Sequence, residues 1–67
     1  MKTLTDALAY MRAHGAAIGS AARSGDALAQ RIISIYQMVY VSPGPASIGL
    51  LLELLTEWQS THVQPET

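Results

Sequence analysis

The segment from Ile48 to Trp58 has the densest apolar pattern in the chain. At about 100° per residue, one face of a helix collects four of its aliphatic side chains: Ile48, Leu51, Leu52 and Leu55. Leu50 and Leu54 fall outside that face, and Trp58 lies between the two sets. A surface helix usually carries an apolar stripe only about 100° wide. We therefore expect the surplus leucines to contact a second surface, most simply another copy of the chain.

A second helical pattern covers residues 4–23. Its apolar positions alternate spacings of four and three, as in an a/d seam: Leu4, Leu8, Met11, Gly15, Ile18 and Ala22. Thr3 or Thr5 can cap its start. Gly15 and Gly19 leave two interpretations open, because glycine weakens a helix interior. Either one continuous helix uses the glycines for close approach by a neighbour, or the helix kinks or ends near Gly15.

A third helical pattern covers residues 27–41. It follows a predicted turn at Ser24-Gly25-Asp26, in which Ser24 or Asp26 can act as the N-cap of the helix. Its main apolar stripe contains Leu28, Ile32, Ile35 and Val39. A second stripe runs beside it and contains Ala29, Ile33, Tyr36 and Tyr40. The spacing is not that of a strand, so we predict a helix despite the β-branched residues.

The segment Ser42-Pro43-Gly44-Pro45 ends the second helix, because two prolines around a glycine cannot continue it. The last helix is predicted over about residues 46–61, and residues 63–67 are expected to form a flexible tail. The fold prediction is an all-α, three-helix domain over residues 1–62. We expect an intertwined or face-to-face helical homodimer, with an interface at these residues: Ile33, Leu50, Leu51 and Leu54.

Size and composition favour the homodimer. A chain of 67 residues buries only about 60% of its unfolded surface, so it is marginally stable alone. It contains no cysteine, which removes disulfides and thiolate metal sites as sources of stability. Hydrophobic residues make up 49% of the chain and charged residues 13%, against about 25% charged in typical domains. Association would cover part of this apolar surface.

The charge distribution disfavours nucleic acid as the partner. The formal net charge is −1, and all four basic residues lie in the first 31 positions. DNA binding draws much of its affinity from several phosphate contacts. The region of residues 41–48 is loosely similar to the turn of a helix-turn-helix, but the helix that follows it has no Lys, Arg or Asn to read bases. A DNA-binding transcriptional regulator of the helix-turn-helix type is thus less favoured than protein binding, and we keep it as the alternative function.

No pattern in the chain predicts catalysis. His14 and His62 lack the close partners of a zinc motif, and we interpret both as structural or surface residues. Glu53 and Glu57 are four residues apart, which fits a solvated polar face better than an acid–base pair. No nucleophile and base have a recognisable spacing. We predict no enzyme activity, no metal and no cofactor.

The function predicted from the sequence is binding to another protein, as a small regulator, adaptor or inhibitor. Protein interfaces favour Tyr, Trp and Arg, and a few such residues dominate the binding energy. The predicted partner-binding residues are accordingly Arg12, Arg23, Tyr36, Tyr40 and Trp58. No apolar run approaches the ~18 residues of a membrane span. We expect a cytoplasmic protein of bacterial or phage origin, and no motif is specific enough to assign a family.

Overall fold

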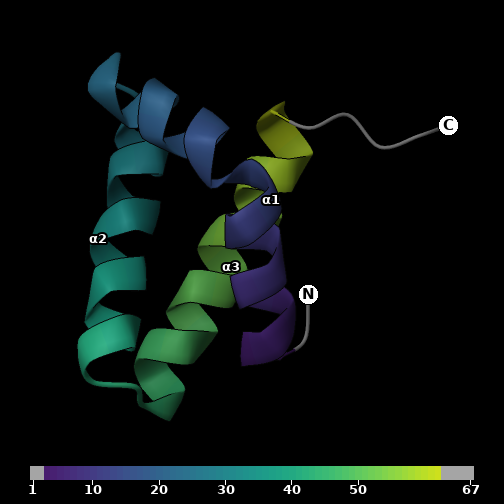
Figure 1. Cartoon of the computed structure of the whole chain (residues 1–67), viewed down its shortest axis with the longest axis vertical. Coiled ribbons are helices and arrows are strands. Elements are labelled where there is room, and N and C mark those ends of the chain that lie inside the picture. The colour runs from purple at the N-terminus through teal and green to yellow at the C-terminus, as the bar shows by residue number, and fades with distance from the viewer. Residues whose placement is uncertain (1–2, 63–67) are drawn as a thin grey trace, which may run out of the picture.

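Three α-helices make up the fold: α1 (Leu4–Arg23), α2 (Ala27–Val41) and α3 (Pro45–His62). The computed structural model describes residues 3–62, and the helices follow one another in a compact arrangement (Figure 1). The all-α, three-helix prediction is confirmed, with helix ends within one residue of the expected ranges. The predicted tail, residues 63–67, and the side chain of His62 lie outside the described residues. The homodimer stays a prediction.

Local hydrogen bonds explain where the helices begin and end. The side chains of Thr3 and Asp26 each accept the backbone N–H three residues further on, at 3.2 Å, and so cap α1 and α2. After α1 the chain reverses through Gly25, whose φ of 98° is in the left-handed region that favours glycine. Gly25 and Asp26 donate N–H groups to the carbonyls of Ala22 and Ala21, a Schellman arrangement that ends α1.

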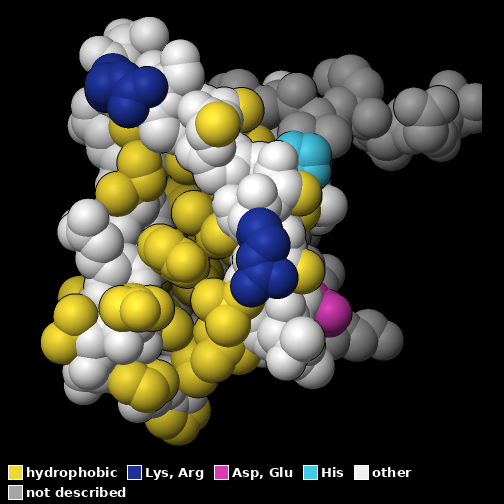
Figure 2. All heavy atoms as spheres, viewed as in Figure 1, with side chains coloured by type: hydrophobic (Ala, Val, Ile, Leu, Met, Phe, Trp, Pro, Cys, Tyr) yellow, Lys and Arg dark blue, Asp and Glu magenta, His cyan; other side chains and the backbone are white. Residues whose placement is uncertain are grey.

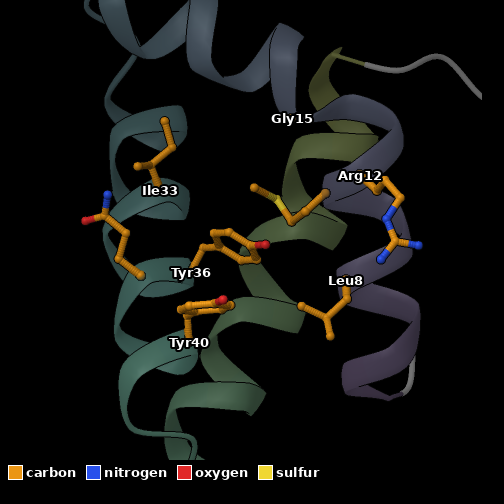
Figure 3. Close-up of a pocket in the computed structure, with 8 residues that line it drawn as sticks. Leu8, Arg12, Gly15, Ile33, Tyr36 and Tyr40 are labelled. Atoms are coloured by element: carbon orange, nitrogen blue, oxygen red, sulfur yellow. The ribbon is translucent and has the colours of Figure 1, made fainter.

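The first helix is continuous through both glycines but bent near its middle. Figures 1 and 3 show the bend, which lies at Gly15, while helical geometry persists from Leu4 to Arg23. A Cβ atom added at Gly15 would meet nothing within 4 Å, and one at Gly19 only the Arg23 guanidinium at 3.8 Å. The expectation that these glycines permit close approach by another helix of the same chain is therefore wrong.

The core lies where the three helices face one another. Its buried side chains are Ala7, Met11, Ile18, Ala29, Ile32, Val39, Leu51, Leu54, Leu55 and Trp58. In α3 the buried face differs from the predicted one, because Leu54, at 6% exposed, is inside while Ile48 and Leu52 are half-buried. The expectation that Leu54 lies outside the core of a single chain is therefore wrong.

The arrangement leaves the space between α1 and α2 open on one side. α2 contacts both other helices extensively, whereas α1 and α3 meet over a smaller region. The molecule is flattened, with principal extents of 31 × 28 × 17 Å. Figure 2 shows hydrophobic side chains gathered in a hollow along α2, on the side that faces the first half of α1. None of the described helices is both long enough and apolar enough to cross a membrane.

Candidate functional site

An open groove lies between the first half of α1 and the second half of α2 (Figure 3). Its volume is about 580 Å³. The residues that line it are Leu8, Met11, Arg12, Gly15, Ile33, Tyr36, Gln37 and Tyr40. We call this the α1–α2 groove. It is mostly apolar, and its walls are helices rather than loops.

Two tyrosines of α2 form one wall of the α1–α2 groove. Tyr36 and Tyr40 are one helical turn apart and extend toward α1, where Leu8 points back at them (Figure 3). Tyr36 is half-buried and packs against the core, which fixes its ring. Tyr40 is 80% exposed, and the adjoining Val41 is 82% exposed. Both tyrosines also line two adjoining hollows, so the apolar surface continues past the groove.

The polar groups of the α1–α2 groove are the side chains of Arg12 and Gln37 and the hydroxyls of Tyr36 and Tyr40, and the Tyr36 hydroxyl points toward α1 (Figure 3). Arg12 is the one charged residue in the lining, and Gln37 is the one amide. The Arg12 side chain is exposed, and its guanidinium group turns away from the tyrosine wall (Figure 3). An occupant would therefore meet a mostly apolar surface with two tyrosine hydroxyls, and a positive charge at the α1 rim.

The structure brings together three of the five predicted partner-binding residues. Arg12, Tyr36 and Tyr40 all line the α1–α2 groove. Arg23 is exposed in the last turn of α1, outside the groove lining. Trp58 is 3% exposed and belongs to the core, so this fold offers no access to its ring. The candidate site therefore keeps the first three residues and leaves out the other two.

The residues predicted for a dimer interface separate into two groups. Leu51 and Leu54 are buried within the single chain, at 0% and 6% exposure, so contact with a second copy would require the core to open. In the single chain both are core residues, and their place in an interface between copies stays a prediction. Leu50 and Ile33 are half-buried and pack against the core. Ile33 also lines the α1–α2 groove.

Several groove residues carry no signal in the sequence that marks them as site residues. The a/d spacing predicts an apolar seam that contains Leu8 and Met11, but Leu8 is 36% exposed while Ala7 beside it is buried. Gln37 and Val41 carried no distinctive signal. The second apolar stripe of α2, which includes Ile33, Tyr36 and Tyr40, was the available indication, because one helix rarely buries two adjacent stripes in so small a domain.

The described residues hold no group of three His, Cys, Asp or Glu side chains that could bind a metal ion. The aromatic ring of Tyr10 stacks on that of His14, with centroids 4.2 Å apart and planes tilted by 30°. The Tyr10 hydroxyl is buried, with no hydrogen-bond partner among the described residues. Burial raises the pKa of Tyr10 above its ordinary value of 10.0.

Tyr10→Phe is expected to leave the free energy of unfolding unchanged or raise it by up to about 1 kcal/mol, because it removes a buried hydroxyl that has no partner. The pH dependence follows from the raised pKa. Folding favours the neutral phenol, so the wild type loses stability as pH rises above about 10, while Tyr10→Phe lacks that loss. Urea unfolding at neutral and alkaline pH measures both effects. A variant much less stable than wild type at neutral pH would show that the hydroxyl has a partner.

No model of a known protein family, no curated protein and no solved structure matches the chain.

Proposed function

We propose that this protein is a non-enzymatic interaction module that binds a helix of another protein in the α1–α2 groove. The observation that carries the proposal is an apolar groove between two helices, lined by two tyrosines, a methionine and an arginine. Interfaces are enriched in these residue types, and an amphipathic helix lying in an apolar groove is a recurrent mode of recognition. Regulator, adaptor and inhibitor are all roles that such binding can serve.

The open form of the groove supports a helix over a small molecule. Small-molecule sites usually enclose most of the ligand surface. The α1–α2 groove covers one side of an occupant, and the hollows that adjoin it are lined by further apolar residues, including Val41 and Pro43. A helix lying along it would keep its polar face in water. The cytoplasmic location and the bacterial or phage origin stay predictions.

The charges on α3 argue against the DNA-binding alternative. Its larger apolar side chains pack in or against the core, and its exposed residues include Glu53 and Glu57 but, within Pro45–His62, no Lys or Arg. Two carboxylates on a recognition helix would face phosphate groups of like charge. Binding to another protein does not bring these carboxylates against phosphate groups.

The test begins with a display library of helical peptides about 16 residues long, roughly 24 Å as a helix. The peptides carry fixed leucines at helical spacing and randomised residues elsewhere, and the folded chain is the bait. Enriched peptides are then measured against Gly15→Leu, which fills the groove. We expect at least about tenfold weaker binding, a loss of about 1.4 kcal/mol.

Gly15→Ala is the matched control. A Cβ at this position meets no other atom within 4 Å, so alanine should fit and raise helix stability by up to about 1 kcal/mol. It should bind the enriched peptides much as wild type does. The proposal is wrong if no peptide is enriched, or if Gly15→Leu, shown to be folded by circular dichroism, binds as tightly as Gly15→Ala.

A further inference from the structure

The charges around the α1–α2 groove indicate which kind of helix it fits. On the basis of the proposed function, we infer that the partner helix is apolar on one face and carries Asp or Glu at the edge that meets Arg12. The guanidinium of Arg12 lies at the α1 rim, beside the apolar lining and not within it (Figure 3). An acidic residue flanking an apolar helix face would therefore meet this group while the apolar face meets the tyrosine wall.

No carboxylate of the described residues lines the groove to compensate Arg12. A basic residue at the same place on a partner would face a like charge. A guanidinium is planar and weakly hydrated, and it can bind both oxygens of a carboxylate at once. The rim thus favours an acidic flank by attraction and disfavours a basic flank by repulsion.

The described helices of the chain do not combine an exposed apolar face with a flanking carboxylate, so an occupant with an acidic flank would be a different protein. α2 exposes Met38, Tyr40 and Val41 but contains no Asp or Glu. α3 exposes two glutamates, whereas no large hydrophobic residue of its described part is fully exposed. α1 has Asp6, but its one exposed large hydrophobic residue is Leu8, which already forms part of the groove.

The test repeats the helical-peptide selection with Arg12→Glu and Arg12→Gln as baits. Arg12 is exposed, so both variants should keep the wild-type circular dichroism spectrum. Peptides enriched on wild type should carry excess Asp and Glu at one flank, and those enriched on Arg12→Glu should carry Lys or Arg there. An acidic peptide should bind Arg12→Gln about two- to fivefold more weakly than wild type, as for an exposed ion pair. Its binding to Arg12→Glu should be weaker still, and the differences should shrink in high salt.

The outcomes separate this inference from the proposed function. If the peptides enriched on wild type and Arg12→Glu have the same flanking charges, the acidic-partner inference is wrong while groove binding stands. If no peptide is enriched on any bait, the proposed function itself fails. Light scattering gives the third outcome: a dimer at micromolar concentration that Gly15→Leu dissociates would show that a second copy fills the groove, which also overturns the inference.

Discussion

Leu54→Glu is expected to unfold the protein. Leu54 lies in the core beside other buried residues of α3, and only 6% of its surface is exposed. Removing the leucine loses its apolar packing, and the new carboxylate would be buried without a partner, which together cost several kcal/mol. A 67-residue domain has a total stability of about 3 to 10 kcal/mol, so most molecules should be unfolded. Circular dichroism at 222 nm and thermal melting measure the loss of helix.

The matched control is Thr56→Glu, two residues further along α3 at an exposed position. It adds the same charge to the same helix but outside the core, and the helix content should stay near that of wild type. The homodimer hypothesis, with Leu54 at the contact between copies, predicts something different for Leu54→Glu. The variant would then be a folded monomer, with the helical signal kept and the molar mass halved in light scattering.

The choice of buried face on α3 shows where prediction from the sequence reached its limit. Two sets of residues have the same helical spacing of three, four and seven: Ile48, Leu51, Leu52 and Leu55, and Leu51, Leu54, Leu55 and Trp58. The structure buries the second set, which places the large indole of Trp58 in the core. Periodicity alone cannot separate two faces of equal spacing, because the surfaces of the neighbouring helices decide between them.

The helices themselves were more predictable than the site. Caps and turns are local, so Thr3, Asp26 and the two prolines around Gly44 placed the helix ends from short stretches of sequence. The groove depends instead on the bend of α1 at Gly15 and on its position beside α2. Neither is a local property. The sequence therefore indicated Tyr36 and Tyr40 as candidate interface residues without showing that Arg12 and Leu8 lie opposite them.

Tyr40→Ala is expected to lose most of its binding to the peptides enriched by selection. Tyr40 lines the α1–α2 groove and is 80% exposed, so its ring is free to contact an occupant. Interface tyrosines that act as hot spots contribute about 2 kcal/mol or more, which corresponds to roughly a 30-fold weaker Kd. The same exposure means that Tyr40→Ala should hardly change the melting temperature. Isothermal titration calorimetry measures the Kd.

Two control variants separate a role in binding from a general effect on α2. Tyr40→Phe keeps the ring, so it should bind within a few-fold of wild type if apolar contact supplies most of the energy. Met38→Ala changes an exposed apolar residue of α2 that does not line the groove, and it should bind normally. If Tyr40→Ala keeps the wild-type affinity, or if Met38→Ala weakens binding as much, the occupied surface is not the α1–α2 groove.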